Sequence, residues 1–81
     1  SETGDARAAL SAFRRVLAAH PTGRTAADAH LGAGLVQLKN MQRPTSAYQH
    51  FQDVIDLEPG SEAAEIARQG IQFIEGDSRG R

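Results

Sequence analysis

The stretch FQDVIDLEPGSEAAEIARQG, residues 51–70, repeats the pattern of FRRVLAAHPTGRTAADAHLG, residues 13–32, at a distance of 38 residues. Each copy begins with Phe, has Pro eight residues later and ends with Gly. Each has the composition of a helix end, a proline turn and a new helix start. A fixed period of 20–50 residues is typical of proteins that stack one supersecondary unit on the next. The sequence therefore predicts stacked helical units.

The matched positions are apolar, small or turn-forming in both copies. They are Ala9 with Ala47, Phe13 with Phe51, Val16 with Val54, Leu17 with Ile55, Pro21 with Pro59, Ala26 with Ala64, Ala29 with Ala67, Gly32 with Gly70, Leu35 with Phe73, and Val36 with Ile74. We expect the two Phe side chains to fill gaps between neighbouring helix pairs. The matched Gly residues let another helix cross near the backbone, at about 1 kcal/mol of propensity cost relative to Ala.

Four apolar-periodic segments predict four helices, over residues 3–19, 25–39, 44–57 and 61–75. Thr25 and Ser61 are the expected N-caps of the second and fourth helices. Pro44 is compatible with a first helical turn. The predicted organisation is a helical domain over 1–75 and a flexible tail over 76–81, which begins at Gly76.

Composition limits the classes of function. A chain of 81 residues rich in helix formers suits one small all-α domain. The net charge of −1 gives no basic field for nucleic acid, and no apolar run predicts membrane insertion. The absence of Cys excludes disulfides and thiolate metal sites. Both cytoplasm and periplasm remain open as compartments for a soluble chain.

The pattern resembles the tetratricopeptide repeat, which carries Leu-Gly in its first helix, then Ala-x-x-x-Phe and a later Pro in its second. The matching residues are Leu31-Gly32, Leu35, Ala47, Phe51 and Pro59, with Ala9, Phe13 and Pro21 before them and Gly70 and Phe73 after them. The resemblance covers about residues 6–75. It implies four antiparallel helices in a short α-solenoid, with one full repeat between two half repeats. The Pro-Gly-Ser-x-Ala-Ala joint is similar to repeats of bacterial envelope proteins.

Two features depart from that family. Asp28 and Ile66 stand where its usual Trp would be, and Gln69 replaces a usual Leu. The period of 38 residues also exceeds the usual 34. We place the extra residues around the connection KNMQRPTS, residues 39–46, through either a longer second helix or a wider loop.

The resemblance implies a non-catalytic interaction module or scaffold that binds a peptide or helix in a concave groove. The implied groove residues are Ala26, Ala29, His30, Ala33, Val36, Gln37, Ala64, Ala67, Arg68, Ile71, Ile74 and Glu75. The Lys/Asn clamp for acidic chaperone tails is missing, so we expect an apolar helix or another protomer. Plain helix packing is the alternative role for these residues. A structural part of a larger repeat array or multidomain regulator is the alternative function.

The fourth helix has more apolar residues than one face needs: Ile66, Ile71, Phe73 and Ile74. Another subunit, in a homo-oligomer, or a further helix would cover them. The alternative is a wide stripe buried on the third helix.

No catalytic constellation is evident, and we expect no enzyme, no cofactor and no metal. His20, His30 and His50 lack the Glu-x-x-His or His-x-x-x-His spacing that places two ligands on one helical face. We therefore expect each His to be structural. The Gly-x-Gly in LGAGL, residues 31–35, lacks the remainder of a phosphate loop and is expected to permit close packing.

Overall fold

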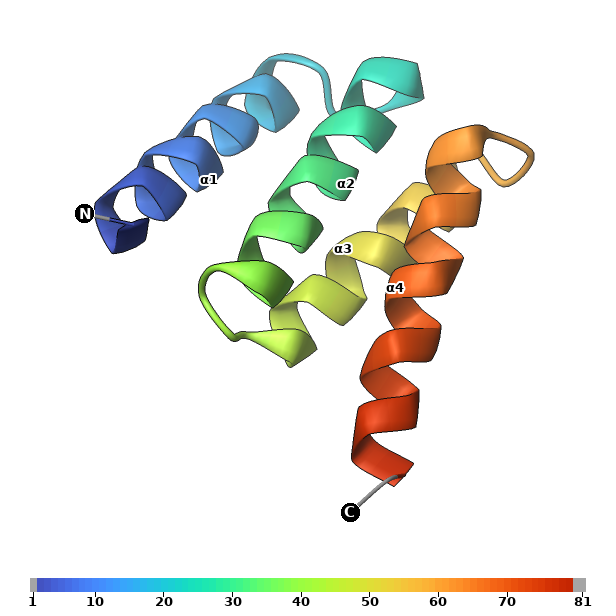
Figure 1. Ribbon diagram of the computed structural model, residues 1–81. Coiled ribbons are helices and arrows are strands. Elements are labelled where there is room, and N and C mark those ends of the chain that lie inside the picture. Colours follow the sequence, from blue (N-terminus) through green and yellow to red (C-terminus); the bar gives the residue numbers. More distant parts are fainter. Residues whose placement is uncertain (1, 80–81) are drawn as a thin grey trace.

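The structure, a computed structural model, describes the backbone of residues 2–79 and the side chains of residues 4–76. The regular secondary structure of this part of the chain is all α-helical, as predicted (Figure 1). Its elements are α1 (Glu2–Ala19), α2 (Gly23–Lys39), α3 (Pro44–Leu57) and α4 (Glu62–Arg79). Among the described helices, none combines the length and apolar character needed to cross a membrane.

Helix α2 begins earlier than the sequence predicts. Its first residue is Gly23, which has φ of 88°, and its N-cap is Thr22 rather than Thr25. Thr22 is extended and makes no side-chain capping bond. Because Gly adopts positive φ without a steric penalty, the chain turns into the helix at Gly23. Thr25 consequently lies inside the first turn, and its predicted capping role is wrong.

Ser61 caps α4, as predicted. Its Oγ accepts a hydrogen bond from the Ala64 backbone N–H at 3.0 Å, and its hydroxyl donates to the Glu58 carbonyl at 2.7 Å. The Arg68 guanidinium donates to the Pro59 carbonyl at 2.9 Å. These bonds satisfy backbone groups that a helix start and a helix end leave without partners. They fix the joint between α3 and α4.

The end of α4 differs from the prediction. The helix continues to Arg79, past the expected end at Glu75. Gly76 lies within it, because one Gly costs about 1 kcal/mol relative to Ala and does not by itself stop a helix. Residues 76–79 of the predicted tail are therefore helical, and residues 80–81 lie outside the described residues.

The connection between α2 and α3 consists of residues 40–43 alone. Gln42 adopts φ of 54°, and the Arg43 N–H donates to the Gln37 carbonyl at 2.8 Å. The loop is short and closely tied to the end of α2. The wide loop, one of the two alternatives for residues 39–46, is therefore not what the structure has.

Helix α2 has neighbours on more than one side (Figure 1). Both α1 and α3 pack against it, and α4 packs against α3 and also touches α2. Within the described residues, α1 meets no helix other than α2. Small side chains allow these approaches, since helix separation depends on the side chains at the contact. The buried alanines are Ala6, Ala26, Ala27, Ala29, Ala33, Ala47, Ala63, Ala64 and Ala67.

The matched Phe and Gly residues meet in space. The Phe51 ring lies against Gly70 of α4 and Gly34 of α2, and the Phe13 ring lies against Gly32. A Cβ added at Gly70 would lie 2.5 Å from Cε2 of Phe51, closer than real side chains approach. Phe51 is fully buried, whereas Phe13 is partly exposed. The expected close approach at both glycines is confirmed.

Candidate functional site

The predicted groove is closed at its alanines. Five of them are at most 4% exposed: Ala26, Ala29, Ala33, Ala64 and Ala67. Methyl groups this small let adjoining helices approach until no room for a partner remains. These five side chains serve helix packing in the structure. Helix packing is the alternative role that the sequence left open for them.

The other predicted groove residues occupy different environments. Ile71 and Ile74 pack against the core, and Val36 is partly buried. Gln37 is 4% exposed, and its Oε1 has no hydrogen-bond partner among the described atoms. Arg68 is held at the α3–α4 joint, and Glu75 is exposed. The set does not form one continuous open surface.

An apolar hollow lies instead between α2 and α4, with a volume of about 360 Å³. We call it the α2–α4 hollow. Its lining consists of Leu35, Leu38, Lys39, Ile66, Gln69, Gly70 and Phe73. Phe73 is 65% exposed and Ile66 is 37% exposed, and among the described residues these are the large apolar side chains left open to solvent. Both therefore gather at one place.

The sequence carried part of this signal. The apolar residues of α4 exceed one face, as noted, and the structure divides them into two groups. Ile71 and Ile74 face the core, whereas Ile66 and Phe73 line the hollow. Ile66 and Phe73 are seven residues apart, which places them on one helical face. The partner face on α2 depends on how the helices cross, which the spacing does not reveal.

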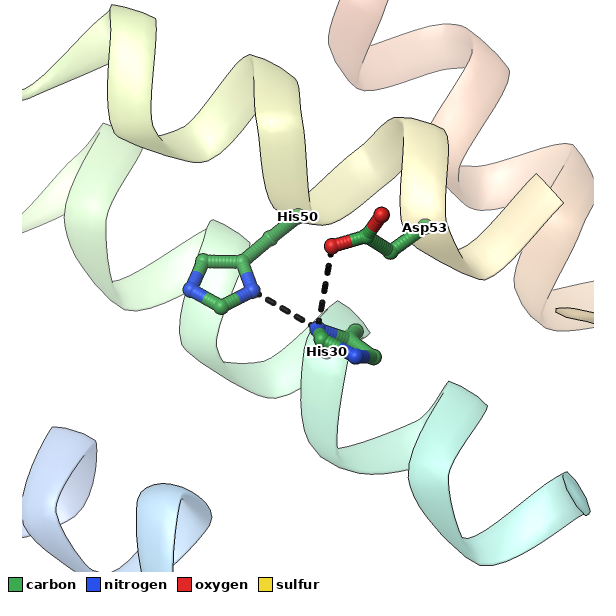
Figure 2. A group of neighbouring side chains, drawn as sticks. All are labelled: His30, His50 and Asp53. Atoms are coloured by element: carbon green, nitrogen blue, oxygen red, sulfur yellow. Dashed lines mark hydrogen bonds and ion pairs between the residues drawn. The ribbon is translucent and has the colours of Figure 1, made fainter. Parts of the chain in front are cut away.

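A polar cluster lies between α2 and α3 (Figure 2). The Nδ1 atoms of His30 and His50 are 2.8 Å apart, and the ring centroids are 5.0 Å apart. The Asp53 Oδ2 lies 3.7 Å from the His30 Nδ1. At the His–His contact one ring donates its N–H and the other accepts with a lone pair. The cluster therefore combines two imidazoles and one carboxylate.

The environment disfavours charge on one of these rings. Burial lowers the pKa of His50 below its usual value, and the neighbouring His30 lowers it further. Asp53 opposes this shift, and the positive charge of Arg14 on α1 adds to it. Near neutral pH, His50 therefore presents a neutral imidazole with a lone pair available.

Sequence reasoning treated these histidines separately and missed the cluster. The available signal was His50 with Asp53, three residues apart, because this spacing places two side chains on one helical face. The contribution of His30 comes from a different helix, through the crossing of α2 and α3. The remaining histidine, His20, is exposed at the end of α1.

No family model matches the chain, and neither the curated proteins nor the solved structures that were compared gave a match.

Proposed function

We propose that the chain is a tetratricopeptide-like interaction module that binds an amphipathic helix of another protein in the α2–α4 hollow. The observation that carries the proposal is the gathering of Ile66 and Phe73, both open to solvent, at one apolar hollow between two helices. Exposed apolar patches on a folded domain commonly mark sites of protein interaction.

The repeated joints support the family part of the proposal. The contact of Phe13 with Gly32 recurs as the contact of Phe51 with Gly70, with the same separation in the sequence. Stacked helix pairs require a repeat that recurs in its contacts as well as in its sequence. Modules of this kind present extended surfaces for binding.

A further helix stacked on α4 as α3 stacks on α2 would meet a polar face. The face of α2 that meets α3 includes Ala27, His30 and Gly34. The residues 38 positions later on α4 are Glu65, Arg68 and Gln72. A polar face of this kind suits solvent rather than a helix like α3. Ile66 and Phe73 lie elsewhere, in the hollow, so we assign them to a separate partner.

The shape of the hollow favours a helix as the occupant. Ile66, Gly70 and Phe73 follow one another at spacings of four and three residues along α4. They form an apolar stripe along one wall of the hollow, and an amphipathic helix binds such a groove through its own anchors at i, i+3 and i+4. Lys39 supplies a positive charge at the lining. We expect a partner helix with two apolar side chains one turn apart and an acidic residue placed toward Lys39.

The lining supports binding rather than catalysis. Lys39 and Gln69 are its polar side chains, and the remaining members are Gly or aliphatic and aromatic residues. General acid–base catalysis needs a positioned group with a suitable pKa, commonly His or a carboxyl. The hollow is therefore suited to an apolar anchor.

A selection from a display library of helical peptides tests the proposal. We expect enriched peptides with an apolar pair one turn apart and an acidic residue beside it. Their affinity should fall about tenfold or more with Phe73→Ser, because one buried aromatic anchor is lost. Gln72→Ser, the adjacent and exposed position, is the matched control and should leave affinity unchanged.

Two outcomes would overturn the proposal. One is a negative peptide result: either no peptides are enriched beyond those that an unrelated helical protein enriches, or the enriched peptides bind the Phe73→Ser variant as tightly as the parent chain. The other is a dimer in sedimentation that Phe73→Ser converts to a monomer. In that case a second copy, and not a helix of another protein, occupies the hollow.

A further inference from the structure

We propose that His30, His50 and Asp53 form a binding site for a divalent first-row transition-metal ion of the Zn²⁺ class. One potential ligand atom from each residue lies within 4.8 Å of the other two. The side chains converge from α2 and α3 on the same point, as Figure 2 shows. This site is independent of the α2–α4 hollow, with which it shares no residue.

The donor atoms decide the class of ion. Two imidazole nitrogens and one carboxylate oxygen are typical ligands of Zn²⁺ and of its neighbours among the first-row metals. Ca²⁺ and Mg²⁺ prefer shells made of oxygen, and they would gain little from the histidines. Three protein ligands leave a fourth tetrahedral position for water or for a group of a bound partner.

Two of the three ligand-atom distances are close to those around a tetrahedral ion, and the third, between His50 and Asp53, is within 4.8 Å. Metal bonds of about 2.0–2.1 Å place neighbouring ligand atoms about 3.3 Å apart. The His30–His50 distance of 2.8 Å is shorter than this, and the His30–Asp53 distance of 3.7 Å is longer. Shifts of about 0.5 Å, within the reach of side-chain rotation, bring both to the required spacing.

The cluster is open to solvent, and two packed helices hold its side chains. The Asp53 side chain is 53% exposed and the His30 side chain is 16% exposed, so an ion reaches the cluster from solvent. His50 and Asp53 share one face of α3, and His30 comes from the adjacent α2. An ion held by all three would link the two helices and would stabilise the folded chain over the unfolded one.

The cluster belongs to the central helix pair, α2 with α3. The positions 38 residues away from His30, His50 and Asp53 hold Arg68, Ala12 and Arg15. None of these is a histidine or a carboxylate, so the repeated pattern does not place the same donor set on α1 or α4.

Titration of the untagged, EDTA-treated chain with Zn²⁺, followed by calorimetry, tests the site. We expect saturable uptake of one ion per chain and a rise in melting temperature. Titration with Co²⁺ should give the visible absorption of a four-coordinate ion. His30→Gln and Asp53→Asn should each weaken binding about tenfold or more, because each removes one ligand.

Matched controls separate the site from general metal adsorption. His20→Gln replaces the exposed His outside the cluster, and Asp56→Asn replaces an exposed carboxylate one turn further along α3. Both should bind Zn²⁺ as the parent chain does. Asp53 is more than half exposed, so its Asn variant tests the ligand without threatening the core.

Three results would overturn the assignment. These are no saturable Zn²⁺ uptake, uptake that survives both His30→Gln and Asp53→Asn, or uptake that His20→Gln abolishes. A melting-temperature rise of equal size in the parent chain and in Asp53→Asn would equally contradict it.

Discussion

The ring of Phe51 lies against the backbone of Gly70, and no side chain fits between them. The residue at the matched position of the first copy, Phe13, lies against Gly32 in the same manner. The joint is therefore repeated as a contact and not only as a sequence pattern. At this contact α4 packs against α3. The same helix carries Ile66 and Phe73, which line the α2–α4 hollow.

Gly70→Ala should destabilise the chain. The new Cβ would lie 2.5 Å from Cε2 of a fully buried ring, so overpacking of about 1–3 kcal/mol outweighs the gain in helix propensity. Chemical denaturation followed by circular dichroism measures the change. Gly76→Ala, at a position in the same helix with open space around it, should instead be neutral or stabilising by up to about 1 kcal/mol. Equal effects at both glycines would contradict the contact.

Phe51→Ala should lower the free energy of unfolding by about 3–5 kcal/mol, because Phe51 is fully buried between α2, α3 and α4. Phe13→Ala should lower it by less, roughly 1–2 kcal/mol, since that ring is partly exposed. Urea titrations of the two variants make the comparison. Near-parental stability of Phe51→Ala would refute the repeat register.

Ser61→Ala should cost about 1 kcal/mol, because the Oγ hydrogen bond to the Ala64 N–H is lost. Thr22 occupies the corresponding cap of α2 without a side-chain bond, so Thr22→Ala should change stability little. The difference between the two variants in thermal unfolding isolates the capping bond. Equal losses of stability in the two variants would contradict the prediction, because, of these two residues, only Ser61 makes a capping bond.

Stability should respond to pH through His50. Its pKa in the folded chain is below the unfolded value of 6.5, owing to burial, His30 and Arg14, against the opposing effect of Asp53. The unfolded state therefore binds more protons between the two values. The stability that goes with the neutral His50 ring is fully present above pH 6.5. It declines as the pH falls through 6.5 toward the lower pKa that His50 has in the folded chain.

Unfolding of the parent chain and of His50→Gln, both in EDTA, measures this effect. The stability advantage of the parent over the variant should shrink as pH falls from neutral. An advantage that grows on acidification would mean that the fold raises the pKa of His50, contrary to our assignment.

The sequence predicted the helical architecture well, and physical reasons explain where it failed. The four apolar-periodic segments predicted the four helices, and Ser61 had the side chain that a cap needs. The position of the α2 start was missed because Gly23 permits a backbone turn that Thr25 does not.

The candidate sites were less predictable. Alanines such as Ala33 suit a groove or a tight helix contact equally well by sequence, and burial alone distinguishes the two. The meeting of His30 with His50 and Asp53 depends on how α2 crosses α3, which the short turn at 40–43 and the packing determine. Spacing along one helix does not contain that information.

The central claim is that the α2–α4 hollow receives a partner helix, and chemical-shift mapping with a library-selected peptide tests it most directly. We predict that backbone amide shifts concentrate at residues 35–39 and 66–73, with α1 unchanged. At the same peptide concentration the shifts should be strongly reduced in Phe73→Ser and undiminished in Gln72→Ser. Shifts centred on α1, or on the cluster of His30, His50 and Asp53, would contradict the claim.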